Sequence, residues 1–278
     1  QEALTANTTG SENTAVGKNA LDANTTASNN TAVGYNVLSA NTTGAQNTGF
    51  GAYTLQVSTT GDDNTALGYH ALGANTTGSQ NVAVGRNALD ANTTASNNTA
   101  IGYNSLTANT TGTQNIAVGA YALDANTTGD DNTAIGYAAL TAATTADHNT
   151  AVGHNCMGAT TTGEDNTAVG ANAFDTNTTG HSCVAIGKDA LTSHTTGQRN
   201  TAIGFKALED LGSTKYNVAV GSYSMYQSTT AEWNTAVGDA SLANNTTGSN
   251  NCAVGQQALY LCTTANDNSA FGTFALGN

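Results

Sequence analysis

The stretch NTAVGKNALDANTTASN, from Asn13 to Asn29, runs directly into NTAVGYNVLSANTTGAQ, from Asn30 to Gln46. The same seventeen-residue unit returns sixteen times along the chain, with no residue inserted or deleted between copies. A short, fixed period of this kind is the signature of a solenoid, in which each repeat buries its core against the next.

Each position of the repeat, counted from Asn13 as position 1, has its own residue preference. Position 5 is glycine in every copy, from Gly17 to Gly272, and position 1 is asparagine in every copy except at Cys183. Position 3 is alanine except at Gly49, and position 9 is mostly leucine. Seventeen residues are too few for a helical repeat, which needs about 33.

The NTAVG segment alternates between β-branched or aliphatic residues at positions 2 and 4 and small residues at positions 3 and 5. This period of two indicates a strand. We predict further short strands at positions 7–9 and 12–14, with corners at the small residues of positions 5 and 15. The sequence therefore predicts an all-β fold, a parallel β-solenoid of sixteen 17-residue coils. We expect a single uninterrupted array over residues 1–278, without capping domains.

The residue preference at each position also predicts which side chains lie in the interior. We expect the aliphatic residues of position 4 and the leucines of position 9 to form the apolar core, and the asparagines of positions 1 and 12 to stack as amide ladders. The alanines of position 3 would then alternate outward and form a stripe for self-association, which favours a trimer or lateral association. The residues predicted for this stripe are Ala15, Ala32, Ala66, Ala83 and Ala100.

The variable positions 6, 7, 10, 16 and 17 contain all the tyrosines and all six Lys and Arg residues, so we expect them to face solvent. Tyrosines concentrate at positions 6 and 7 and predict an exposed stripe suited to a surface glycan, a receptor or a second copy of the chain. Ordinary surface tyrosines are the alternative. The predicted stripe consists of Tyr35, Tyr53, Tyr69, Tyr103, Tyr121 and Tyr137, with Tyr223 further along.

Composition limits the partners and the chemistry. The net charge of −13 makes nucleic acid and anionic membranes poor partners, and no apolar run approaches the roughly 18 residues of a membrane span. No catalytic pattern of unlike residues stands out from the repeat, so we expect no enzyme activity, no cofactor and no metal. The four cysteines fit no paired CxxC site. Acid pairs at positions 16 and 17, such as Asp62-Asp63, could bind Ca²⁺, with solvated acids as the alternative.

The motif NTAVG followed by x-x-A-L resembles the coil repeat of trimeric autotransporter adhesin heads (YadA-like). It also resembles the NTAVG-type repeats in the shafts of phage tail-fibre-like proteins. The resemblance covers all sixteen copies. It implies a trimeric parallel β-roll displayed outside the cell, on a cell surface or as a virion appendage.

From these observations we predict a structural protein that forms the shaft of an extracellular filament, surface adhesin or virion fibre. The alternative is an ice-binding β-solenoid that uses the Thr-Thr ladder of positions 13 and 14. Because residues 1–6 repeat positions 6–11, where the last copy stops, we also expect copies to stack end to end into filaments. The Asn-x-Thr sequons of position 12 leave glycosylation open, unless the asparagines are buried.

Overall fold

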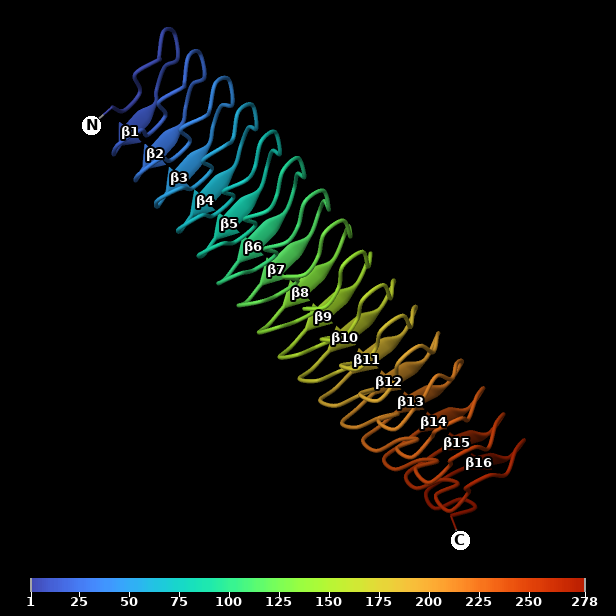
Figure 1. Ribbon diagram of the computed structural model, residues 1–278. Coiled ribbons are helices and arrows are strands. Elements are labelled where there is room, and N and C mark those ends of the chain that lie inside the picture. Colours follow the sequence, from blue (N-terminus) through green and yellow to red (C-terminus); the bar gives the residue numbers. More distant parts are fainter. Residues whose placement is uncertain (1, 278) are drawn as a thin grey trace. The chain divides into compact units, whose positions relative to one another are not determined.

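The computed structural model describes residues 2–277, and within them it contains strands and turns and no helix. The chain divides into two compact units, Gln1–Ala138 and Ala139–Asn278. In each unit, successive coils place their single strands side by side (Figure 1). The strands of the first unit are β1 (Thr14–Val16), β2 (Thr31–Val33), β3 (Thr48–Phe50), β4 (Thr65–Leu67), β5 (Val82–Val84), β6 (Thr99–Ile101), β7 (Ile116–Val118) and β8 (Thr133–Ile135). Those of the second unit are β9 (Thr150–Val152), β10 (Thr167–Val169), β11 (Val184–Ile186), β12 (Thr201–Ile203), β13 (Val218–Val220), β14 (Thr235–Val237), β15 (Cys252–Val254) and β16 (Ser269–Phe271).

Neighbouring strands within each unit are parallel, and each residue pairs with the residue seventeen positions later. Thr14 pairs with Thr31 in the first unit, and Thr150 pairs with Thr167 in the second. The predicted parallel β-solenoid with 17-residue coils is confirmed in both units. The strands predicted at positions 7–9 and 12–14 are wrong, because the chain forms turns at positions 7–9 and bends at positions 12–14.

These turns explain two features of the repeat. Positions 7, 9 and 17 have a positive φ in successive coils, for example Asn36 at 54° and Leu38 at 50°. β-Branched residues are strongly disfavoured there, and no Val, Ile or Thr occupies any of these positions. At position 5 the φ of Gly102 is 140°, and a Cβ would lie 2.5 Å from the carbonyl oxygen of Gly119 in the next coil. Only glycine fits that position.

The backbone of the turns is bonded to neighbouring coils, as in the strands. The Leu38 amide donates to the Thr54 carbonyl of the following coil, and the Asn36 amide donates to the Lys18 carbonyl of the preceding coil. Each coil therefore exchanges backbone hydrogen bonds with the coils before and after it, which satisfies groups that would otherwise be costly to bury.

The two faces of the strand are opposite to those expected from the sequence. Four of the five predicted stripe residues, Ala32, Ala66, Ala83 and Ala100, are completely buried, and Ala15 in the first coil is half-buried. The residues of position 4, which we predicted to be in the core, lie on the surface instead; Ile101 is 40% exposed. The alanines therefore cannot provide a surface for self-association. The prediction for the leucines of position 9 is confirmed, because Leu38 and its equivalents from Leu21 to Leu259 are buried.

A narrow interior accounts for this inversion. Position 3 faces the residues of positions 8 and 9 across the coil, so there is room for a methyl group and little more. Gly49 shows the constraint, because a Cβ there would lie 2.5 Å from Cγ1 of Val37. Val37 is the one valine at position 8, and the adjoining coil has the one glycine at position 3. The two exceptions compensate each other in volume, as close packing requires.

The predicted asparagine ladders are confirmed. At position 12, the Asn41 side-chain amide donates to Oδ1 of Asn24 at 3.1 Å and to the Gly44 carbonyl at 2.8 Å. At position 1, Oδ1 of Asn30 accepts from the backbone amide of Asn47 at 2.9 Å, while its Nδ2 donates to the same Gly44 carbonyl. The sequon asparagines from Asn24 to Asn245 are buried and are inaccessible to a glycan in the folded chain, whereas Asn7 in the first coil is half-buried.

The inverted faces give a direct test with adjacent residues. Replacing buried Ala100 by Glu places an uncompensated charge in the interior and should lower the free energy of unfolding by about 3–5 kcal/mol. Replacing exposed Ile101 by Glu should lower it by less than about 1 kcal/mol. Chemical denaturation of both variants, followed by circular dichroism, measures the difference. Equal destabilisation, or the reverse order, would contradict the placement of the two faces.

Candidate functional site

The outer face of the strands is a regular surface in each unit. Position 2, mostly threonine, and position 4, always aliphatic or phenylalanine, point outward from the strands. Most coils therefore add one polar and one apolar side chain to the face, and the coils with Val82, Ile116, Val184 and Val218 at position 2 add two apolar ones. The exposed residues of position 4 are Val16, Phe50, Leu67, Ile101 and Ile135 in the first unit, and Val169, Ile186, Ile203, Val237 and Phe271 in the second.

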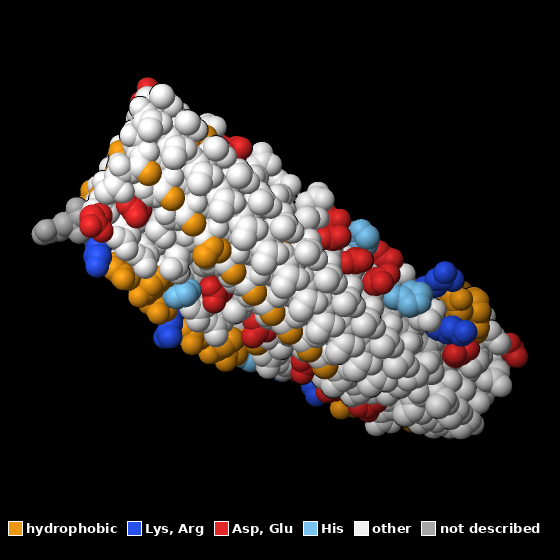
Figure 2. All heavy atoms as spheres, turned by 45° about the horizontal axis from the view of Figure 1, so that its top comes forward, with side chains coloured by type: hydrophobic (Ala, Val, Ile, Leu, Met, Phe, Trp, Pro, Cys, Tyr) orange, Lys and Arg blue, Asp and Glu red, His pale blue; other side chains and the backbone are white. Residues whose placement is uncertain are grey.

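The predicted tyrosine stripe lies on the surface of the first unit, and its members contact one another. Tyr35, Tyr53 and Tyr69 form a zigzag of edge-to-face rings, with centroids 5.3 and 5.8 Å apart. Arg86 continues this group, because its guanidinium lies 5.8 Å from the centroid of the Tyr69 ring and 5.9 Å from that of Tyr103. Figure 2 shows hydrophobic side chains along this edge, interrupted by His and basic side chains.

Three more tyrosines extend the stripe beyond Arg86. Tyr103, Tyr121 and Tyr137 repeat the edge-to-face arrangement, with centroids 5.4 and 5.9 Å apart. Desolvation and the neighbouring Tyr103 raise the pKa of the Tyr121 phenol. The six predicted stripe residues thus form two groups of three rings, joined by Arg86.

The Thr-Thr pair at positions 13 and 14 gives one outward rank of threonines. Thr42 of position 13 donates its hydroxyl to the Thr59 carbonyl of the next coil at 3.1 Å, and Thr59 donates in the same way to Thr76. Position 14 is exposed, as at Thr43 and Thr60. Each coil therefore contributes a single exposed threonine from this pair.

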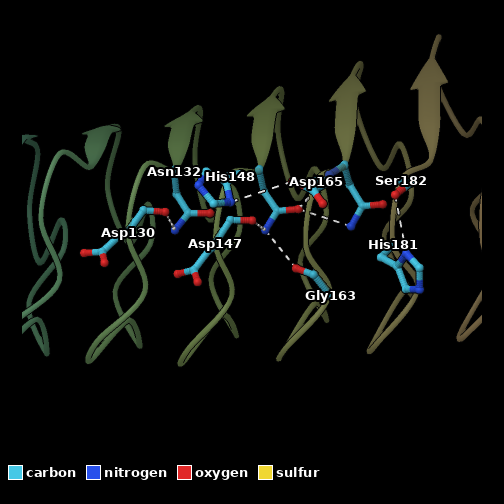
Figure 3. Close-up of polar contacts among 10 residues, drawn as sticks. Asp130, Asn132, Asp147, His148, Gly163, Asp165, His181 and Ser182 are labelled. Carbon is cyan, nitrogen blue, oxygen red and sulfur yellow. Dashed lines mark hydrogen bonds and ion pairs between the residues drawn. The ribbon is translucent and has the colours of Figure 1, made fainter.

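The acid pairs have structural partners rather than metal-binding geometry. Asp62 accepts the backbone amide of Ala45 at 2.7 Å, which caps a group of the preceding coil. In the second unit, the His148 ring lies 3.7 Å from the Asp165 carboxylate. Figure 3 shows His148 and Asp165 and, further along the unit, His181 beside Ser182. The buried Asn149 donates from Nδ2 to the Asp147 and Gly163 carbonyls. Among residues 2–277, no group of three or more His, Cys, Asp or Glu side chains is arranged to hold a metal ion.

The cysteines of residues 2–277 are all unpaired thiols, including Cys252 and Cys262. Burial raises the pKa of Cys156 to about 12 and that of Cys183 to about 11. Both buried thiols are therefore protonated at neutral pH and are poor nucleophiles.

No protein-family model and no curated protein matches the chain. Within the described residues there is no helix of the length and apolar character that crossing a membrane requires.

One coil replaces both of its ladder asparagines, with Cys183 at position 1 and His194 at position 12. The larger imidazole occupies the space beside the smaller thiol, with Nε2 3.9 Å from the sulfur. Nε2 also faces Nδ2 of Asn200 at 3.2 Å, and Nδ1 contacts the Gly212 carbonyl. A neutral ring that donates from Nδ1 and accepts at Nε2 fits this arrangement. The sequence shows the double replacement but not that the two side chains meet.

This buried imidazole predicts a pH dependence of stability. Burial of the imidazole lowers the pKa of His194 below its ordinary value of 6.5, and this desolvation outweighs the backbone groups of Gly212, Gly197 and Leu211, which favour the charged ring. The unfolded chain therefore takes up a proton first as the pH falls. The stability that depends on neutral His194 is complete above pH 6.5 and is lost as the pH falls toward the folded-state pKa.

Urea denaturation at pH 7 and at pH 5 tests this expectation. The unmodified chain should lose more free energy of unfolding over this interval than the Cys183→Asn/His194→Asn variant, in which the ladder is restored and the other histidines are unchanged. Identical losses in the two proteins would show that His194 does not contribute.

Proposed function

We propose that the chain is a structural segment of an extracellular fibre, the shaft of a filament, surface adhesin or virion fibre, and that it has no catalytic activity. The observation that carries this proposal is the exposed aliphatic rank of position 4 on the sheet face. Contiguous exposed apolar surface generally marks an interaction site. Here position 4 is exposed in ten of the sixteen coils and half-buried in the other six, and it is separate from the core of positions 3, 8 and 9.

A partner that contacts the position-4 side chains of successive coils needs groups repeated at the same spacing as the coils. Another copy of the chain has that period by construction, and closed cyclic symmetry would let each copy present the same face to its neighbour. A trimer is the arrangement that we favour, in agreement with the resemblance of the NTAVG-x-x-A-L motif to adhesin heads and tail-fibre shafts. The resemblance also supports the extracellular or virion setting.

Ice binding is the weaker candidate. A surface that matches ice needs regular ranks of outward side chains, and the Thr-Thr pair supplies only one exposed threonine in each coil. The hydroxyls of position 13, such as that of Thr42, are engaged by the next coil. If solutions of the chain showed thermal hysteresis, ice binding would replace the fibre as the proposed function.

Charged substitutions on two different faces test the fibre proposal. The unmodified chain should sediment as an oligomer, and Ile101→Glu/Ile135→Glu should reduce it to single chains, because paired sheet faces cannot bury the new charges. The matched control, Thr94→Glu/Thr111→Glu, adds the same charge at exposed position 14 and should leave the oligomer intact. Analytical ultracentrifugation gives the masses, and circular dichroism confirms that both variants fold.

Two outcomes would contradict the proposal. One is an unmodified chain that remains a single chain at tens of micromolar concentration. The other is an oligomer that survives the Ile101→Glu/Ile135→Glu substitutions.

A further inference from the structure

In three consecutive coils of the second unit, position 17 contains Arg199, Tyr216 and Trp233, which form a cluster. The Trp233 ring stacks on Tyr216, with centroids 4.0 Å apart and an interplanar angle of 18°. Arg199 also contacts Tyr216. Its guanidinium lies 5.7 Å from the centroid of the Tyr216 ring, and its Nη1 donates to the Tyr216 hydroxyl at 3.1 Å. In every other copy, position 17 is polar or charged.

Trp233 is the one tryptophan of the chain, and 56% of it is exposed. The next residue at position 17 is Asn250, which offers no ring to stack on the indole. Figure 2 shows, toward one end of the second unit, a group of hydrophobic side chains between Lys and Arg side chains, with His beside it. Burying so large an aromatic surface in water-free contact is a common source of binding free energy.

A polar hollow of about 460 Å³ adjoins this cluster. Arg199 belongs to both, because it lines the hollow and also bonds to Tyr216. The other lining residues are Thr162, Glu164, Asp165, Thr179, His181 and Ser182. From Asp165 to Trp233 the surface crosses four coil steps, about 19 Å at the usual inter-strand spacing of ~4.8 Å.

The side chains of this surface match one class of ligand. Carboxylates such as Glu164 and Asp165 accept hydrogen bonds from hydroxyl groups, whereas Arg199 only donates. The indole of Trp233 can cover the C–H face of a sugar ring, which is apolar. A chain of hydroxyl-bearing rings about as long as the surface satisfies all these groups together.

We infer that the hollow and the Tyr216–Trp233 pair form one binding site for a neutral oligosaccharide, with Trp233 as the stacking platform and Glu164, Asp165 and Arg199 as the hydroxyl-binding groups. This site goes beyond the shaft proposal and does not depend on self-association.

The charge of the surface favours a neutral ligand over an acidic one. Arg199 and Lys215 are balanced by Glu164, Asp165 and Glu232 on the same ridge, and the whole chain has a net charge of −13. A polyanionic glycan or a nucleic acid would be repelled by this field. Paired carboxylates and a guanidinium are instead complementary to hydroxyl groups.

The single tryptophan makes the test direct, because all indole fluorescence comes from the site. Maltohexaose, cellohexaose and mannohexaose serve as neutral probes, and sialyllactose and chondroitin sulfate as acidic ones. At least one neutral probe should shift or quench Trp233 emission in a saturable manner and protect it from acrylamide. No change with any neutral probe up to millimolar concentration, or a response to the acidic probes alone, would overturn the inference.

Matched variants test the hollow separately from the platform. Glu164→Gln/Asp165→Asn keeps Trp233 and the shape of the surface, and it should weaken binding of the neutral probe at least tenfold. The control Asp62→Asn/Asp63→Asn makes the same chemical change in the first unit and should leave the affinity unchanged. Equal affinities in all three proteins would overturn the role of the hollow. Binding that persists in the Ile101→Glu/Ile135→Glu variant would separate this site from the shaft proposal.

Discussion

The rest of the structure depends on the hydrogen bonding of asparagine amides between successive coils. A coil of seventeen residues has little apolar interior, and its turns leave many backbone groups pointing inward. The asparagines of positions 1 and 12 fill the corner, bond to the carbonyl of position 15, and bond to the equivalent residues of the next coil. Because each amide bonds to the residue at the same position one coil away, the ladders fix both the period and the register.

The asparagine ladders also constrain the other positions of the repeat. The turns that bring the asparagines together require positive φ at positions 7, 9 and 17 and glycine at position 5. They also bring positions 8 and 9 against position 3, so that only small side chains fit inside the strand. The bulky β-branched residues are left to face outward. The exposed aliphatic rank on which the proposed association rests is therefore a consequence of how the corner is built.

Periodicity was enough to predict the solenoid, its 17-residue coil, the asparagine ladders and the surface tyrosines. Periodicity could not assign the faces of the strand. Alternation places positions 2 and 4 on one side of the strand and position 3 on the other, but it does not say which side faces the interior. We assumed that the larger residues were buried, but the coil is too narrow for them. The matched exceptions at Val37 and Gly49 contained the answer. The Trp233 surface was not predicted, because it depends on non-repeated residues from several coils that only the stacking brings together.

An interruption of the ladder offers the most direct test of its importance. At Ser58 the position-12 ladder breaks, and Oδ1 of Asn41 and Oγ of Ser58 are buried without a hydrogen-bond partner. Ser58→Asn should restore the missing contact and raise the free energy of unfolding by about 1 kcal/mol, and Asn92→Ala should lower it by about 1–3 kcal/mol. The control Thr94→Ala, at an exposed position, should change it by less than about 0.5 kcal/mol. Equilibrium denaturation that gives opposite signs for the two ladder variants supports the account, whereas values for both that equal the control would contradict it.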